Sequence, residues 1–409
     1  MPFARTAPLR RELETALPQR PFSIVFWDGT RLASNDGGAA STNGRAPTFS
    51  LRSPGALAHA LRAPGQLGIG RAYVAGELEV DDLDAALEVV DAWKAPPLDH
   101  RARLRLAVAA ARACGLRRPP SRPQGELLPR GRRHSRDRDA RAVRHHYDVS
   151  NDFFSLFLDD SMTYSCGIFS RGAMTLEEAQ EAKLELVCRK LDLRPGERVL
   201  DVGCGWGSFA LHAAGRHDVE VVGITLSEPQ ARAARERARE AGLGDRIDIR
   251  VADYRDLSGE RFDAIASIGM VEHVGASRID VYARRLGALL APGGRLLNHG
   301  IARLRHGDPE AGPFSERYVF PDAAPLHLSR ILLALERAGF TTDHVEGFAD
   351  DYARTLDHWI ERLDARVGDA TRLAGPERVR VWRLYLRAAR RGFLSGFTSI
   401  YQVRATRAG

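Results

Sequence analysis

A glycine-rich segment in the middle of the chain, VLDVGCGWG (199–207), has residue types and spacing suited to binding a ligand. An apolar stretch ends at Asp201, and glycines follow at Gly203, Gly205 and Gly207. Glycines at this point let the backbone turn tightly and approach a ligand closely. The G-x-G-x-G spacing differs from the G-x-G-x-x-G of a dinucleotide site. With an acidic residue at the strand end, the segment favours a ligand with a cationic amino-acid moiety over a pyrophosphate.

Polar residues follow the next two apolar stretches of the chain. The first stretch, VEVVGITL (219–226), should end over a ribose. The second, IDIRVADY (247–254), brings an Asp that can accept a hydrogen bond from an adenine amino group. The alternative is that these are ordinary polar residues at strand ends. The candidate cofactor-binding residues are Thr225, Leu226, Ser227, Gln230, Asp253 and Tyr254.

The elements that must position these residues alternate between helix and strand from about residue 177. EEAQEAKLELVCRKL (177–191) predicts a helix before the glycine-rich segment, and a long helix is expected through Ala241. FDAIASIG (262–269) and GGRLLNHGIA (293–302) predict further strands. Alternation of this kind indicates an α/β fold with a doubly wound, mostly parallel, Rossmann-like sheet.

The part of the chain before residue 142 is expected to contain a small α+β domain and a linker. Residues 1–115 form the domain, in which PFSIVFWDGTRLAS (21–34) predicts a hairpin turning at Asp28-Gly29. Residues 116–141 carry four Pro and almost no apolar residues, which predicts a flexible basic linker. The second domain should therefore span 142–409.

The net charge of +7 is unevenly distributed. Residues 101–145 hold fourteen Arg and three acidic residues, a local balance of +11 that leaves −4 for the remaining chain. Such a segment suits a polyanion, either nucleic acid or an anionic membrane surface, or else is a solvated linker. Arg is the default cation, since only Lys94, Lys183 and Lys190 are lysines.

The order of motifs resembles that of the cyclopropane-fatty-acyl-phospholipid synthases and mycolic-acid cyclopropane synthases. This resemblance covers roughly residues 142–404 and implies class I binding of S-adenosylmethionine by a methyltransferase domain at 142–409. It also implies that Tyr164 and Ser165 contact the cofactor. The motifs are HHYDVSNDFFSLFLDDSMTYSCGIF (145–169), VLDVGCGWGSF (199–209), GITLSEPQ (223–230), ADYRDL (252–257), SIGMVEHVG (267–275), RYVFPD (317–322) and FADDYARTLDHW (348–359).

The same resemblance implies a bound bicarbonate ion, with Cys166, Glu272, His299, the backbone of Ile301, and Tyr352 as its ligands. In that family the methyl group adds to an alkene, and bicarbonate removes a proton from the resulting carbocation to close a cyclopropane ring. The residue types are suitable, because Cys, His, Tyr and a backbone N–H can donate to a small anion in an apolar cleft. Glu272 would accept the hydroxyl proton of bicarbonate and stabilise positive charge.

Each of these side chains also has an ordinary structural explanation. In this alternative, Cys166 is a small buried residue and His299 is a core histidine. Tyr352 is then an interface tyrosine, and Glu272 forms a surface pair with its neighbour His273. Some family members carry a cysteine in the C-terminal helix, where this chain has Ala389. A mechanism that requires a thiol at that position is therefore excluded.

The expected substrates are unsaturated phospholipids at an anionic membrane surface, reached by a cytoplasmic protein that docks peripherally. No apolar run is long enough to span a bilayer, no signal peptide is visible, and the four cysteines form no CxxC pair. The basic segment at 101–144 would meet the headgroups. FFSLFL (153–158) is either an apolar patch near the cleft or domain core. The N-terminal domain could help to present lipid, and dimerisation would strengthen docking by avidity.

Three competing functions remain open from the sequence. A related methyltransferase could act on the same alkene and give a methylene- or methyl-branched chain. A nucleic-acid methyltransferase would normally show N-P-P-Y or Pro-Cys where this chain has SIGMVEHVG (267–275), so no nucleic-acid partner is expected. A lipid-binding protein without turnover would not need the glycine-rich loop and Glu272 together. No metal site is predicted, because His145-His146 are adjacent and no further ligand lies at metal-binding spacing.

Overall fold

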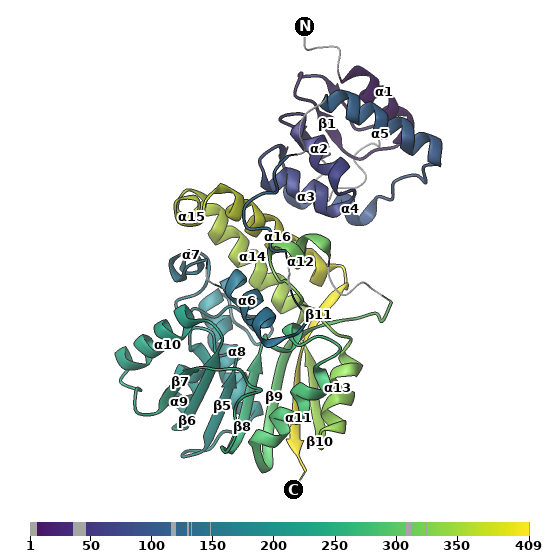
Figure 1. Cartoon of the computed structure of the whole chain (residues 1–409). Coiled ribbons are helices and arrows are strands. Elements are labelled where there is room, and N and C mark those ends of the chain that lie inside the picture. The colour runs from purple at the N-terminus through teal and green to yellow at the C-terminus, as the bar shows by residue number, and fades with distance from the viewer. Residues whose placement is uncertain are drawn as a thin grey trace. The chain divides into compact units, whose positions relative to one another are not determined.

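The computed structural model describes residues 6–35, 46–115, 120–128, 131, 133–147, 149–307, 312–323 and 325–408. The chain forms two compact units, whose elements are labelled in Figure 1. The first unit consists of Met1–Glu126 and Gly375–Arg391, and the second of Leu127–Ala374 and Gly392–Gly409. Within the described ranges, no helix is both long enough and apolar enough to cross a membrane.

The first unit is an α+β domain built around a four-stranded sheet in the order β2-β1-β3-β4. The predicted hairpin is confirmed, because β1 and β2 pair in antiparallel fashion and Gly29, with φ of 80°, lies in the turn between them. Its strands are β1 (Ser23–Val25), β2 (Arg31–Leu32), β3 (Thr48–Leu51) and β4 (Leu78–Val80). Its helices are α1 (Ala7–Ala16), α2 (Gly55–Arg62), α3 (Gln66–Val74), α4 (Leu83–Ala92) and α5 (His100–Cys114).

Most of helix α16 (Pro376–Leu394) belongs to the first unit, whereas the predicted second domain ran unbroken to residue 409. Arginines of this helix form ion pairs with acidic residues from the other end of the sequence. Arg387 and Arg390 contact the two carboxylate oxygens of Asp84 at 3.0 and 2.7 Å, and Arg391 contacts Asp91 at 2.6 Å. Composition alone does not reveal this pairing, because the partners are about 300 residues apart.

The segment predicted as a flexible linker, 116–141, contains ion pairs and the start of a helix where the structure describes it. Arg71 donates two hydrogen bonds to the Glu126 carboxylate, at 2.9 and 2.5 Å, and both side chains are buried. Helix α6 (Arg136–Tyr147) begins inside the segment, and Arg138 pairs with Asp322. The contacts at these positions are ion pairs rather than apolar burial, and the flexibility of the segment remains a prediction.

The second unit contains a seven-stranded sheet in the order β10-β11-β9-β8-β5-β6-β7. Strands β9, β8, β5, β6 and β7 are parallel, and β11 pairs in antiparallel fashion with both β9 and β10. This confirms the predicted mostly parallel, Rossmann-like sheet. The strands are β5 (Arg198–Val202), β6 (Glu220–Thr225), β7 (Ile247–Val251), β8 (Phe262–Ile268), β9 (Leu290–Arg303), β10 (Phe340–Gly347) and β11 (Thr398–Arg407).

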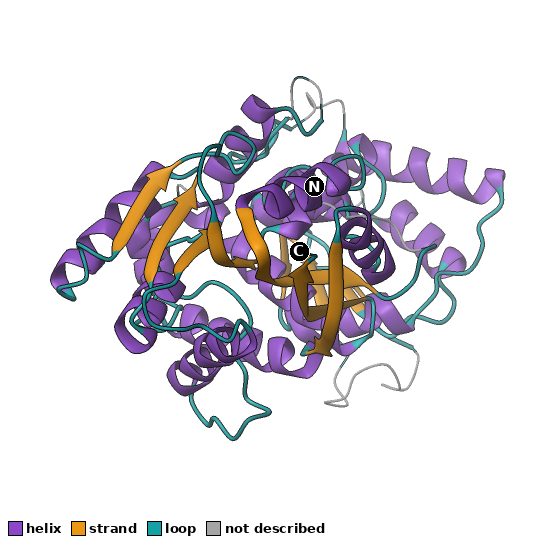
Figure 2. Ribbon diagram, turned by 90° about the horizontal axis from the view of Figure 1, so that it is seen from below, coloured by secondary structure: helices purple, strands orange, loops and turns teal. Residues whose placement is uncertain are grey.

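Helices cover both faces of this sheet (Figure 2). One apolar core packs α11 and α13 against the strands, and a second packs α8, α9 and α10. The helices are α7 (Asn151–Ser155), α8 (Leu176–Lys190), α9 (Ser208–His217), α10 (Glu228–Glu240), α11 (Ile279–Leu289), α12 (Pro313–Tyr318), α13 (Leu328–Arg337), α14 (Ala349–Ala365) and α15 (Val367–Ala374), with a 3-10 turn at Val271–His273.

The strand order reverses direction at β5. From there the chain proceeds through β6 to β7 on one side, and through β8 to β9 on the other. In open α/β sheets, ligands bind outside the carboxyl ends of the strands at such a switch point. The fold therefore locates a binding site next to the glycine-rich segment that follows β5.

Candidate active site

A pocket opens at the carboxyl ends of β5, β6 and β8, where the topology predicts it. Ten of the twelve predicted cofactor-binding residues line it, and Gly207 and Ser227 lie just behind. Those that line it are Tyr164, Ser165, Asp201, Gly203, Gly205, Thr225, Leu226, Gln230, Asp253 and Tyr254.

The glycines of the loop after β5 have two different tasks. Gly203 has φ of 83°, and a Cβ there would lie 3.1 Å from the Met270 side chain across the pocket. Gly207, with φ of 82°, caps helix α9, and a Cβ there would lie 3.1 Å from Ala234 on α10. The first glycine keeps the pocket open, and the second lets the two helices approach closely.

Asp201, at the end of β5, is fully buried, and its Oδ2 atom has no hydrogen-bond partner among the described residues. Burial raises the pKa of this carboxyl to about 7, which the nearby Lys183 opposes. A buried acceptor without a partner is costly, so it indicates a place for a donor or cation from a ligand. This suits the cationic amino-acid moiety expected from the sequence.

Lys183 of helix α8 lines the same pocket, although sequence reasoning did not select it. Its ammonium donates to Ser165 Oγ at 3.0 Å, and burial lowers its pKa to about 8. The Gln180 amide, one turn earlier, donates to the backbone oxygens of Thr163 and Ser165 at 3.3 and 2.8 Å. Helix α8 thus fixes the segment that carries Tyr164 and Ser165.

The residues after β6 hydrogen-bond to one another. The Thr225 hydroxyl donates to Gln230 Oε1 at 2.8 Å and accepts from the Ser227 amide at 3.2 Å. The Ser227 hydroxyl caps helix α10. With its oxygen engaged by Thr225, Gln230 can turn only its NH₂ group to a ligand, which suits the oxygen of a ribose hydroxyl.

After β7, the carboxylate of Asp253 is already paired with a protein cation. Arg255 donates to its two oxygens at 2.8 and 2.5 Å. Burial raises the pKa of Asp253, but the hydrogen bonds from Arg255 outweigh it and hold the pKa below its usual value. Asp253 therefore remains ionised. Its Oδ1 atom also accepts from the Arg255 amide at 2.9 Å, so Oδ2 is the oxygen with a further lone pair to accept from an adenine amino group.

Glu272 lies in the 3-10 turn that follows β8 and reaches toward β9. Its Oε1 atom accepts from the Ile301 amide at 3.4 Å, whereas its buried Oε2 atom has no partner among the described residues. Burial raises the pKa of this carboxyl to about 7. The alternative of a surface pair with His273 is therefore wrong, because Glu272 is buried.

His299 of β9 is fully buried, and its protonation state can be inferred from its neighbours. Lys190 donates to Gln402 Oε1 at 2.7 Å, so the NH₂ group of Gln402 faces His299 Nδ1 at 3.2 Å. Because Nδ1 accepts, the ring proton is assigned to Nε2. Nε2 is buried without a partner among the described residues. Burial also lowers the pKa of His299 to about 3, so the ring is a neutral donor.

Cys166 and His299 lie beside Phe348, whereas Tyr352 follows Phe348 by one turn in helix α14 and its ring lies 4.6 Å from that of Phe393. The Cys166 thiol lies 3.7 Å from the Phe348 carbonyl oxygen, and burial raises the pKa of this thiol. The rings of His299 and Phe348 are 6.3 Å apart, and the Tyr352 amide donates to the Phe348 carbonyl at 3.0 Å. Together with Glu272, these side chains come from four separate parts of the chain. None of them is among the residues that line the cofactor pocket.

FFSLFL (153–158) is core rather than an exposed patch. Phe153, Phe154 and Phe157 are fully buried. The Phe154 ring lies 5.0 Å from Trp206 and 5.5 Å from Tyr164, and Tyr164 stacks on Trp359 at 5.0 Å. Aromatic side chains therefore form one wall of the pocket, where they exclude water and can stabilise a cation through their π faces.

Lys183, Gln180, Lys190 and Gln402 are the residues that sequence reasoning missed. One signal was present, because two of the chain's three lysines are among them in a protein that otherwise uses Arg. An ammonium is compact enough to donate inside a narrow site, which a guanidinium is not. The glutamines offered no such signal, since their roles depend on partners distant in the sequence.

Comparison with known proteins is consistent with this geometry. The sequence model of the mycolic acid cyclopropane synthetase family matches residues 134–403. A probable fatty acid methyltransferase of Mycobacterium tuberculosis is 37% identical over 97% of this chain and 93% of its own. The cyclopropane-fatty-acyl-phospholipid synthase of Escherichia coli is 35% identical over 88% of both chains. The crystal structure of mycolic acid cyclopropane synthase CmaA1 complexed with SAH and CTAB is 34% identical, covers 66% of this chain and 98% of its own, and superposes with a TM-score of 0.63.

The family match covers most of the chain, including the pocket, the aromatic wall and the buried Glu272 and His299. The fold of the second unit is shared with the solved structure over almost that structure's entire length. The chain therefore belongs to the mycolic acid cyclopropane synthetase family, whose members modify lipid acyl chains, and it is an S-adenosylmethionine-dependent methyltransferase.

Proposed function

We propose that this enzyme transfers the methyl group of S-adenosylmethionine to the cis double bond of an unsaturated phospholipid acyl chain and closes a cyclopropane ring. The observation that carries the proposal is a pair of unpartnered, buried polar atoms, one on the 3-10 turn after β8 and one on β9. Glu272 Oε2 is a buried acceptor, and His299 Nε2 is a buried donor. Few buried polar atoms stay unpaired in proteins without a ligand to satisfy them.

Methyl transfer breaks the bond between sulfur and the methyl carbon, while the alkene π electrons form the new carbon–carbon bond. Positive charge then develops on the acyl chain. The aromatic rings of Tyr164 and Trp206, with the carboxylate of Glu272, would stabilise this charge without forming a bond to it. The Cys166 thiol is a poor nucleophile because its burial raises its pKa, so it would not trap the cation.

Loss of a proton from the transferred methyl group closes the ring and leaves S-adenosylhomocysteine as the other product. The site fits a bicarbonate ion as the base, because Glu272 Oε2 can accept its hydroxyl proton and His299 Nε2–H can donate to an oxygen. The Ile301 amide, Cys166 and Tyr352 would complete the site. When bound there, bicarbonate would supply the base for this proton transfer.

Docking on an anionic membrane would bring the acyl chain to the enzyme. Helix α5 carries exposed Arg101, Arg105 and Arg112, with Leu104 and Val108 exposed between them. We refer to these five residues as the α5 basic face. Basic residues would attract anionic headgroups, and the apolar side chains would enter the interface.

The test is mass spectrometry of lipids after incubation of the protein with S-adenosylmethionine and vesicles of unsaturated phospholipid. We expect a gain of one CH₂ per modified chain, with loss of the alkene proton signals by NMR. Glu272→Gln should abolish the product while retaining cofactor binding, and the surface variant Glu240→Gln should behave as wild type. An unchanged lipid mass at every lipid composition and salt concentration would contradict the proposal.

A second candidate product is a methylene- or methyl-branched chain. It is favoured by the 37% identical relative, whose name is probable fatty acid methyltransferase. The cation on the acyl chain is common to both reactions. A 1,2-hydride shift to this cation, followed by proton loss from the transferred methyl group, gives the methylene branch, and proton loss from a neighbouring chain carbon gives a methyl-branched alkene. The same mass gain with a new methylene or methyl-branch signal by NMR would identify this outcome.

A further inference from the structure

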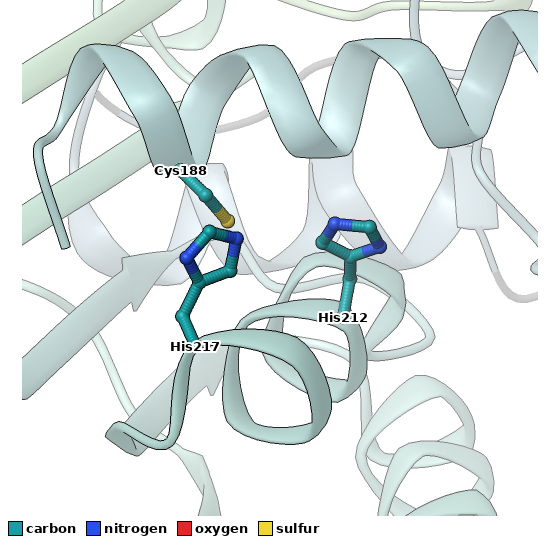
Figure 3. Close-up of side chains that lie close together, drawn as sticks. All are labelled: Cys188, His212 and His217. Carbon is teal, nitrogen blue, oxygen red and sulfur yellow. The ribbon is translucent and has the colours of Figure 1, made fainter. Parts of the chain in front are cut away.

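A cluster of metal-ligating side chains lies between helices α8 and α9, apart from the methyl-transfer site. Cys188 stands in the last turn of α8, and His212 and His217 come from α9 (Figure 3). The Cys188 sulfur and one nitrogen of each ring all lie within 4.8 Å of one another. Figure 3 shows the thiol of Cys188 directed at the His217 ring, across the gap between the two helices.

Glu185, one turn before Cys188, adds a carboxylate to the cluster. Its Oε2 atom lies 3.2 Å from His212 Nε2 and 3.0 Å from His217 Nε2. In a tetrahedral site with bonds of about 2.0 Å to nitrogen or oxygen, neighbouring ligand atoms are about 3.3 Å apart. The Glu185 carboxylate thus already lies at almost that distance from each of the two rings. Glu185 also forms an ion pair with Arg189, at 3.7 Å.

We propose that Glu185, Cys188, His212 and His217 bind a divalent transition-metal ion of the zinc class. One thiolate, two imidazoles and one carboxylate form the mixed sulfur, nitrogen and oxygen set that zinc accepts in tetrahedral sites. A thiolate, a carboxylate and two neutral imidazoles cancel the charge of the ion, which suits a position at the edge of the core. The His212, His217 and Glu185 side chains are 9, 19 and 37% exposed, so an ion can enter from solvent.

The site would join two helices that both contribute to the cofactor pocket. Lys183 of α8 and Ser208 of α9 line that pocket, and each lies within two turns of a proposed ligand. A bound ion would therefore fix the spacing of α8 and α9 and stabilise the pocket wall without taking part in methyl transfer. The sequence does not reveal the site, because Cys188 and His212 are 24 residues apart and His212 and His217 are not at i, i+4.

The test is titration of the purified, chelator-treated full-length chain with Co²⁺, followed by visible and near-ultraviolet absorption. We expect one equivalent to produce the intense d–d bands of a tetrahedral ion together with a thiolate-to-cobalt charge-transfer band. Cys188→Ala should abolish the charge-transfer band. His217→Asn should weaken binding by at least about tenfold, as the loss of a ligand should cost no less than the loss of a supporting residue. Competition with Zn²⁺ should bleach the spectrum of the wild-type protein.

Two variants serve as matched controls: Cys114→Ala removes a buried cysteine of the first unit, and His344→Asn removes a surface histidine that contacts a glutamate. Both should keep the full cobalt spectrum. His217 lies at the end of α9, so its variant should fold even if Cys188→Ala does not. Absence of tetrahedral bands, or equal Co²⁺ binding by His217→Asn and wild type, would overturn the proposal. No lipid or S-adenosylmethionine is used, so this result is independent of the proposed reaction.

Discussion

Burial changes the chemistry of the two carboxylates at the centre of the site. Asp201 and Glu272 are ordinary acids in sequence, yet burial raises the pKa of each to about 7. Each also has one oxygen that no described residue satisfies. At neutral pH, the charge of both carboxyl groups therefore depends on whether a proton or a cationic ligand is bound.

Asp201→Asn tests the first carboxylate. The wild-type affinity for S-adenosylmethionine should fall as pH decreases through about 7, by up to about tenfold per unit, because protonation removes the charge that attracts the cation. The variant should bind about 10- to 100-fold more weakly at pH 8 and lose this pH dependence. Isothermal titration calorimetry from pH 6 to 8 measures both effects. The surface variant Asp245→Asn should match wild type, and a pH-independent wild-type affinity would exclude titration of Asp201.

Glu272→Gln separates stability from activity. Since its folded-state pKa is raised above the unfolded value of 4.5, Glu272 destabilises the protein progressively between about pH 4.5 and 7, and by a constant amount above. The neutral variant should therefore be more stable than wild type at pH 8, by roughly 2–4 kcal/mol, while kcat falls by at least about 100-fold. Denaturant unfolding at pH 5 and 8 measures the difference. A variant equally destabilised at both pH values would contradict this assignment.

At the residue scale, the sequence predicted the contiguous part of the site better than the dispersed part. Asp201 and Gly203 share one strand and turn, so their spacing alone indicates a ligand loop. Lys183 and Gln402 act through partners such as Ser165 and His299, which are near only after folding. The contribution of these residues to the site depends on tertiary packing, so it cannot be predicted from their spacing in the sequence.

At the scale of single elements, helix α8 begins with a capping box that positions the residues it presents to the pocket. The Thr175 hydroxyl accepts from the Glu178 amide at 3.2 Å, and the Glu178 carboxylate accepts from the Thr175 amide at 3.2 Å. Thr175→Ala should destabilise the first turn by about 1 kcal/mol. Hydrogen exchange measured by mass spectrometry should then be about fivefold faster there. Thr175→Ser keeps the acceptor and should remain close to wild type; equal acceleration in both variants would contradict the role of the cap.

A second prediction at this scale concerns the close contact between strand β9 and the 3-10 turn at Val271–His273. A Cβ at Gly300 would lie 2.2 Å from Val271 and 3.1 Å from Glu272 Oε2, so no side chain fits there. Gly300→Ala should displace the turn that carries Glu272, cost about 1–3 kcal/mol of stability and lower kcat, with the affinity for S-adenosylmethionine retained. Gly307→Ala, which has open space around its Cβ, is the matched control. Lost cofactor affinity with unchanged kcat would show that the strain spreads to the pocket instead.

The sequence also predicted the type of each element better than it predicted where one unit ends and the other begins. The strands β5 to β9 follow from apolar runs bounded by turns, and all five form the predicted parallel sheet. The start of α6 inside the expected linker was missed, because that segment is held by ion pairs such as Arg138 with Asp322. Hydrophobic patterning does not detect a segment that is ordered by charge.

At the scale of the whole molecule, sequence order and compact units do not coincide. Helix α16 lies within the stretch that the family model matches, 134–403, but belongs mainly to the first unit, where its arginines contact Asp84 and Asp91. Removing residues 1–115 would take these carboxylates away from the arginines of α16. A test of membrane docking is therefore cleaner with point substitutions in the full chain than with a truncated one.

The α5 basic face allows such a test. Arg101→Gln with Arg112→Gln removes two exposed cations, and each basic residue near an anionic surface contributes about 1 kcal/mol, so affinity for anionic vesicles should fall roughly 30-fold. The wild-type affinity should also decrease steeply with salt, because the attraction is screened within a Debye length. Vesicle co-sedimentation at several salt concentrations measures both effects.

The matched control is Arg232→Gln with Arg261→Gln, which removes the same charge from exposed positions of the second unit. If docking depends on the position of the charge, this control should bind vesicles as wild type does, and both double variants should bind S-adenosylmethionine normally. Activity on detergent-dispersed lipid should then be equal in all three proteins, since dispersion removes the need to dock. Equal loss of vesicle binding in the two double variants would instead mean that net charge, rather than the α5 basic face, governs the encounter with the membrane.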